Sequence, residues 1–180
     1  MKYFSSKARW AKTFSIICLL GMLFSACSHK SNYSNIPAIT YNSFTCFCDA
    51  AKPTQSDSAY LRVNFTDGDG DIGYPTSDAS APNDFFVIPT IDSSGIFTPL
   101  IVNDTILTFK YHIPYITPSG TDKSLNGIIQ INLENLVQQI SGLTIPNHNT
   151  HIFQFQVWIM DRAGNKSNIL TSPTVHSCGG

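Results

Sequence analysis

The chain has 180 residues, of which 42% are hydrophobic and 13% charged, and its formal net charge at pH 7 is −1. Because basic and acidic residues nearly balance, there is no excess of positive charge to hold nucleic acid, and we expect no nucleic-acid partner. Of the 12 acidic residues all but Glu134 are aspartate, a bias that favours turns over helices.

The first 26 residues have the three parts of a secretory signal. An N-terminal stretch carries basic residues and no acidic one, the apolar run "FSIICLLGMLF" follows, and small residues end the segment. The basic residues are Lys2, Lys7, Arg9 and Lys12. The apolar run is too short to span a bilayer as a stable helix. We therefore expect residues 1–26 to be a removable signal, which leaves a chain with more acidic than basic residues.

The residue after this signal is Cys27, and "LFSAC" resembles the lipobox of bacterial lipoproteins. The resemblance implies that Cys27 is acylated and becomes the new N-terminus, although Phe24 stands where that motif prefers leucine. Several acyl chains, at about 0.8 kcal/mol per buried methylene, give stable membrane anchoring. No aspartate follows Cys27, so the resemblance implies the outer membrane, at its periplasmic face or at the cell surface. The alternative is an ordinary exported protein with an unmodified Cys27.

Residues 27–36 are polar after the cysteine and have no periodic pattern, so we expect a flexible tether there. The remaining residues, 37–180, suit one domain with a single core. Three cysteines lie in this domain: Cys46, Cys48 and Cys178. In an oxidising compartment we expect Cys178 to form a disulfide with Cys46 or Cys48. The alternative is a metal site on "CFC", for which the chain has no second ligand pair at zinc-like spacing.

Alternating apolar and polar residues predict about seven short strands and one short helix. In residues 58–66, for example, Ala59, Leu61, Val63 and Phe65 point to one side. The predicted strands are residues 58–66, 84–91, 96–102, 107–115, 127–133, 151–160 and 167–175. Only residues 133–141 indicate a helix. This pattern predicts an all-β fold, a single immunoglobulin- or fibronectin-like antiparallel β-sandwich.

The segment "FTDGDGDIG" follows the first of these strands and places Asp67, Asp69 and Asp71 at every second position. Such spacing can turn three carboxylates toward one calcium ion, while glycine lets the backbone bend. The three match positions 1, 3 and 5 of an EF-hand loop and Asp78 matches position 12, but position 6 is Ile72 and the flanking segments are strands. We therefore predict a calcium site at one end of the sandwich. The alternative is a solvated Asp-Gly turn.

A second polar loop, "DRAGN", is expected beside the first. If residues 58–66 are the second strand of the sandwich and residues 151–160 and 167–175 are the last two, both loops lie at the same end. Asp161 and Asn165 then approach the three aspartates. With Asp78, they complete the predicted set of calcium ligands.

The paired motifs "VNFTDGDGDIG" and "VWIMDRAGNKSNILTSPTV" resemble a group of Bacteroidota lipoproteins of unknown function, and the second is similar to the closing hairpin of many bacterial immunoglobulin-like domains. The resemblance covers roughly residues 55–176. It implies the sandwich fold and an extracytoplasmic location. It implies no activity.

The sequence has none of the usual catalytic motifs, such as GxSxG, HExxH or a phosphate-binding glycine loop. We expect a non-catalytic binding or accessory module for a glycan or protein ligand. Trp158, out of register with the core positions of its strand, is the candidate ligand-binding residue; the alternative is that neighbouring segments cover its ring. A structural subunit of an outer-membrane complex and a hydrolase are the other possibilities that the sequence leaves open.

Overall fold

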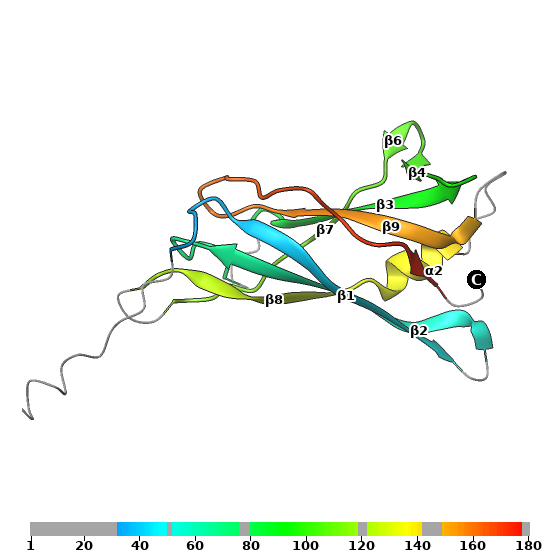
Figure 1. Cartoon of the computed structure of the whole chain (residues 1–180), viewed down its shortest axis with the longest axis horizontal. Coiled ribbons are helices and arrows are strands. Elements are labelled where there is room, and N and C mark those ends of the chain that lie inside the picture. Colours follow the sequence, from blue (N-terminus) through cyan, green and yellow to red (C-terminus); the bar gives the residue numbers. More distant parts are fainter. Residues whose placement is uncertain (1–31, 50–51, 76–79, 119–121, 142–148, 178–180) are drawn as a thin grey trace, which may run out of the picture. The chain divides into compact units, whose positions relative to one another are not determined.

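The computed structural model describes residues 32–49, 52–75, 80–118, 122–141 and 149–177 (Figure 1). The predicted signal, Cys27, Asp78 and Cys178 lie outside these ranges. Residues 31–180 form one compact unit. Among the described residues, no helix has the length and apolar character needed to cross a membrane.

Two antiparallel sheets face each other, which confirms the predicted all-β sandwich (Figure 1). The first sheet has the order β1-β2-β8, with β1 at Ala38–Asp49, β2 at Lys52–Asp67 and β8 at Leu125–Asn132. The second has the order β10-β9-β3-β4, with β10 at Leu170–Thr171, β9 at Asn149–Ile159, β3 at Phe85–Ser93 and β4 at Ile96–Pro99. The second and the last long strands thus lie in opposite sheets, as the immunoglobulin-like order predicts.

The remaining elements are short. β7 (Phe109–Tyr111) also pairs with β3, and β11 (Val175–His176) pairs with β9. β5 (Ile101–Val102) and β6 (Thr105–Ile106) form a separate hairpin, labelled β6 in Figure 1. The helix α2 (Glu134–Ser141) begins where the Asn132 side chain accepts a hydrogen bond from the Glu134 N–H, 2.8 Å away.

The core consists of the inward-facing residues of both sheets. The four predicted inward residues of β2, from Ala59 to Phe65, are between 0% and 4% exposed, and Phe153, Phe155, Val157 and Ile159 of β9 are fully buried. Phe44 on β1 contacts the rings of Phe153 and Phe155, with centroids 6.3 Å and 5.5 Å apart. Each fully buried large side chain contributes about 1.5–3 kcal/mol relative to exposure. The period-two pattern therefore found the core positions of β2 and β9, to which α2 adds Leu136, Val137 and Ile140.

Four strand predictions differ from the structure. The predicted strand 96–102 is divided into β4 and β5, which belong to different sheets. β1 was not among the predicted strands, because its register shifts between Tyr41 and Ser43 and again near Cys48 and so breaks the alternation. The predicted strand 107–115 is reduced to β7, with Pro114 at an isolated bridge to Tyr74. The predicted strand 167–175 is divided into β10 and β11 by a segment that contains Pro173, which has no N–H to donate to a ladder.

One side chain joins the two sheets at the beginning of β1. The Asn168 amide accepts a hydrogen bond from the Ile39 N–H and donates one to the Ile39 carbonyl, both at 2.9 Å. Asn168 precedes β10, at the edge of the other sheet. Its amide thus takes the place of a neighbouring strand for one residue of β1.

Candidate metal centre

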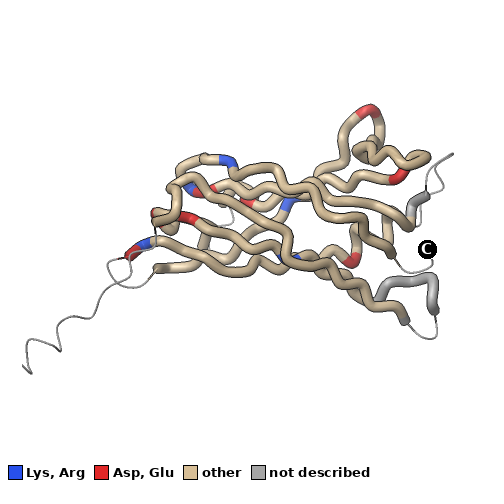
Figure 2. The backbone as a smooth tube through the Cα atoms, viewed as in Figure 1, with Lys and Arg blue, Asp and Glu red and all other residues tan. Residues whose placement is uncertain are grey.

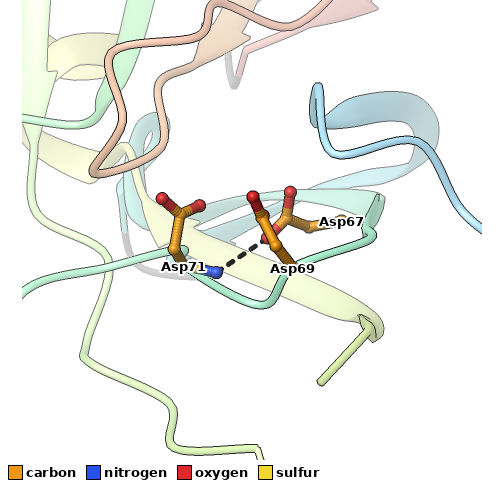
Figure 3. Close-up of side chains that lie close together, drawn as sticks. All are labelled: Asp67, Asp69 and Asp71. Atoms are coloured by element: carbon orange, nitrogen blue, oxygen red, sulfur yellow. Dashed lines mark hydrogen bonds between the residues drawn. The ribbon is translucent and has the colours of Figure 1, made fainter. Parts of the chain in front are cut away.

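The acidic loop leaves the end of β2 in a tight turn. Asp67 is the last residue of β2, and its carboxylate accepts a hydrogen bond from the Asp71 N–H, 2.9 Å away at Oδ2. Gly70 and Gly73 have φ of 70° and 79°, a region in which glycine has no steric penalty. The turn brings residues 67, 69 and 71 to one side of the loop (Figure 3).

The three aspartates form a compact group of oxygen ligands. One carboxylate oxygen from each of Asp67, Asp69 and Asp71 lies within 4.8 Å of the other two. Asp67 is buried, Asp71 is half-buried and Asp69 is exposed. A cation at this position would therefore be open to solvent on the side of Asp69 and would contact the buried carboxylate of Asp67 on the side of the core.

Two oxygens of this group are buried without a hydrogen-bond donor. Asp67 uses Oδ2 for the Asp71 N–H, and Asp71 uses its own Oδ2 for the Ala163 N–H at 3.0 Å, but Oδ1 of both residues has no partner. Buried polar atoms in native proteins nearly always have a partner, and an unsatisfied charged group is the most costly case. Both unsatisfied oxygens belong to the group that could hold an ion, and the third such atom among the described residues, Asp84 Oδ2, lies outside that group.

Burial and mutual repulsion disfavour the ionised form of these acids. Burial first, and then the charges of Asp69, Asp71 and Asp161, raise the pKa of Asp67 to about 6 against the opposing hydrogen bond from the Asp71 N–H. The pKa of Asp71 is also raised, first by burial and then by Asp161 and Asp69. A divalent cation would reverse these effects, because it favours every carboxylate in its charged form.

The loop "DRAGN" lies against the acidic loop, as the topology predicted. The Arg162 N–H donates to the Asp71 carbonyl at 3.1 Å, and the Arg162 guanidinium donates to the carbonyls of Ile72 and Gly73 at 3.1 Å and 2.8 Å. The same guanidinium lies over the Tyr115 ring, 4.7 Å from its centroid. Arg162 was not among the predicted site residues, although it stands inside the motif. Its role is to fix the backbone beside the triad.

Asp161 and Asn165, both predicted as ligands, are occupied with each other. Asp161 is 2% exposed, and its two oxygens accept hydrogen bonds from the Asn165 N–H at 2.7 Å and from the Asn165 side-chain amide at 2.8 Å. The structure does not bring Asp161 into the group of three. It does place the Asp161 charge near enough to raise the pKa of Asp67 and Asp71.

Trp158 has partners within the protein. Its ring stacks on Phe86 with centroids 5.1 Å apart and an interplanar angle of 5°, and the Lys166 ammonium lies 4.3 Å from its centroid. Phe86 is the cross-strand neighbour of Trp158, and Lys166 comes from the segment after "DRAGN". These contacts favour the alternative in which neighbours cover the ring.

The cysteine predictions are resolved in part. Cys48 is disulfide-bonded, and since Cys178 lies outside the described residues, its pairing with Cys178 stays a prediction. Cys46 packs half-buried against the core. A zinc site on "CFC" is excluded by the disulfide, because a zinc ligand must be a free thiolate.

Charged residues are few elsewhere on the described part of the chain, and Figure 2 shows no continuous band of Lys and Arg on it.

The chain matches no protein-family model, no curated protein and no solved structure.

Proposed function

We propose that this protein is a membrane-anchored extracytoplasmic module, non-catalytic, in which a calcium ion bound by Asp67, Asp69 and Asp71 holds the loops at one end of the sandwich. The observation that supports the ion is the pair of buried, unpartnered oxygens, Asp67 Oδ1 and Asp71 Oδ1, within a group of three carboxylates. Asp161 and Asn165 support this site from the neighbouring loop.

The donor set favours calcium over other ions. All three side chains offer hard carboxylate oxygens, whereas zinc prefers nitrogen and sulfur ligands. Magnesium requires near-ideal octahedral geometry and keeps several waters, while calcium accepts six to eight oxygens in irregular arrangements. An exposed Asp69 leaves room for water to complete the coordination. The expected affinity is that of other extracellular modules, on the order of 10⁻⁴ to 10⁻³ M.

Calcium is expected to raise the melting temperature of the protein. An ion that binds only the folded state stabilises it by about 2.7 kcal/mol at a hundredfold excess over Kd. For a domain of this size that corresponds to a rise of roughly 8 °C. Asp69→Asn should reduce the rise strongly, because it removes a ligand that has no hydrogen bond within the protein to lose. The measurement is thermal unfolding in EDTA and in increasing calcium.

Asp104→Asn is the matched control. Asp104 is exposed in the turn of the β5–β6 hairpin at φ 60°, a conformation that asparagine adopts as readily as aspartate. Its calcium response should equal that of the wild-type protein. If calcium leaves the melting curve of the wild-type protein unchanged, the calcium site is refuted and the acidic loop is a solvated turn.

The ligand of the module is proposed to be a protein. Exposed apolar side chains gather on the β5–β6 hairpin and the adjoining β4, namely Ile96, Ile101, Val102 and Ile106. Apolar surface of this kind favours protein contacts over glycans. With Trp158 stacked on Phe86, a sugar platform at that residue has less support. A subunit of an outer-membrane complex would present the same surface.

The proposed anchor is tested at Cys27. In a bacterial host that processes lipoproteins, the wild-type protein is expected to incorporate labelled palmitate and to fractionate with membranes. Cys27→Ser should lose both properties, whereas Cys18→Ser, inside the predicted signal, should keep them. Labelling that persists in Cys27→Ser, or an unmodified Cys27 found by mass spectrometry in the soluble fraction, would refute the anchor.

A further inference from the structure

We propose that the cation also docks the N-terminal segment, Tyr33–Ile36, on the acidic loop, so that occupancy of the metal site sets where the domain ends and the tether begins. This inference rests on the proposed calcium site and concerns its regulation. Residues 33–36 were predicted above as the last part of a free tether. In the proposed docked state they are instead part of the folded domain.

The contact lies between two of the candidate ligands. Gly68, which separates Asp67 from Asp69, donates its N–H to the Ser34 carbonyl at 2.8 Å. A Cβ on Gly68 would collide with the Tyr33 carbonyl and would lie 2.8 Å from the Ser34 carbonyl carbon and oxygen. The segment therefore passes in van der Waals contact with the backbone that presents the ligands.

The docked segment has few other attachments. Residues 32–36 are all exposed, and the Ile36 N–H is held locally by the Ser34 hydroxyl at 3.0 Å. The opposite part of the loop is fixed more firmly, because Asp71 is held by the N–H groups of Arg162 and Ala163. Repulsion among the three carboxylates in the absence of a cation should therefore distort the loop first at Gly68, the side with the weaker attachment.

Release of the segment would change the reach of the anchor. Each extended residue spans at most about 3.3–3.6 Å, so four residues add about 13 Å to the tether. Calcium would shorten the tether and hold the acidic end of the domain close to the anchoring point. By linkage, docking of the segment must in turn strengthen calcium binding by the same factor.

Hydrogen exchange of the mature protein, in calcium and in EDTA, tests the inference. The main reporter is the amide of Gly68, whose hydrogen bond to the Ser34 carbonyl joins the segment to the loop; the amide of Ile36, bonded within the segment to the Ser34 hydroxyl, reports whether the segment stays ordered. Calcium is expected to slow their exchange at least about tenfold, and to slow chymotrypsin cleavage after Tyr33, which is 37% exposed. The β5–β6 hairpin, residues 101–106, is the internal control and should exchange equally in both buffers.

Gly68→Ala separates docking from binding. The φ of Gly68 is not positive, so alanine is allowed there, and the added methyl, which would collide with the Tyr33 carbonyl, is expected to displace the weakly attached segment and not the loop that carries the carboxylates. The variant should keep a calcium-induced rise in melting temperature, but Ile36 exchange should no longer respond to calcium. If wild-type protein shows the thermal response with unchanged exchange at Ile36 and Gly68, the inference is overturned and the calcium site stands. If calcium has no thermal effect on wild-type protein, both are overturned.

Discussion

Asp67→Asn is expected to have opposite effects in the two buffers: it should stabilise the calcium-free protein and abolish stabilisation by calcium. Asp67 is fully buried, burial holds its pKa at about 6, and one of its oxygens lacks a donor. The amide removes the buried charge and still offers an oxygen to the Asp71 N–H. We expect a gain on the order of 2 kcal/mol at pH 7 in EDTA. At saturating calcium the wild-type protein should be the more stable of the two.

The pH dependence of the calcium-free protein follows from the same residue. The pKa of Asp67 is about 6 in the folded state, whereas an ordinary aspartate has a pKa of 3.8, so the folded state binds more protons between these values. Stability must therefore fall as pH rises from about 4 to 6. Asp67→Asn should weaken this fall but not remove it, because the pKa values of Asp71 and Asp84 are also raised by burial.

Thermal unfolding in EDTA at pH 4.5, 6 and 7.5 measures both effects. The control is again Asp104→Asn, which should follow the wild-type curve at each pH. If Asp67→Asn lowers the melting temperature in EDTA at pH 7.5, the Asp67 carboxylate stabilises the turn without a cation. That result would contradict the proposal that the buried charge needs a bound ion.

Gly70→Ala is expected to be the most destabilising single change in the acidic loop, at roughly 2–5 kcal/mol. Gly70 has φ 70°, a conformation that costs other residues about 1–2 kcal/mol. A Cβ there would also collide with the Lys123 carbonyl and would lie 2.6 Å from the Pro118 ring. Since a backbone carbonyl cannot turn aside as a side chain can, the clash adds about 1–3 kcal/mol.

Gly95→Ala isolates the conformational part of this effect. Gly95 has φ 88° in the turn between β3 and β4, but nothing lies within 4 Å of its virtual Cβ. It should cost only about 1–2 kcal/mol. Denaturant unfolding of both variants in EDTA gives the comparison, and equal losses would show that the packing of Pro118 and Lys123 on Gly70 does not hold in solution.

Local patterns predicted much of this molecule. The alternation in residues 58–66 and 151–160 identified the two central strands, and the spacing of Asp67, Asp69 and Asp71 identified the one group of three side chains among the described residues that could hold a metal ion. Strand order then predicted that "DRAGN" would lie beside them. These inferences held because period, spacing and topology do not depend on side-chain detail.

What the sequence could not predict depends on contacts between distant residues. Asp161 was expected as a ligand, but its oxygens are taken by Asn165, and only coordinates reveal which of two polar partners a carboxylate selects. The hydrogen bond from Gly68 to Ser34 joins a loop to a segment with no periodic pattern. The partners of Trp158 come from a neighbouring strand and a turn.

The Asn168 side chain gives the domain a mechanical property. A pull on residues 32–37 enters the fold at Ala38, where β1 pairs with the end of β2, and alone would peel that ladder one hydrogen bond at a time. One residue further on, the two 2.9 Å hydrogen bonds between Ile39 and Asn168 tie β1 to the other sheet. Force at this end is therefore shared between both sheets from the second residue of the strand, so the two hydrogen bonds to Asn168 must break along with the pairing of β1 and β2.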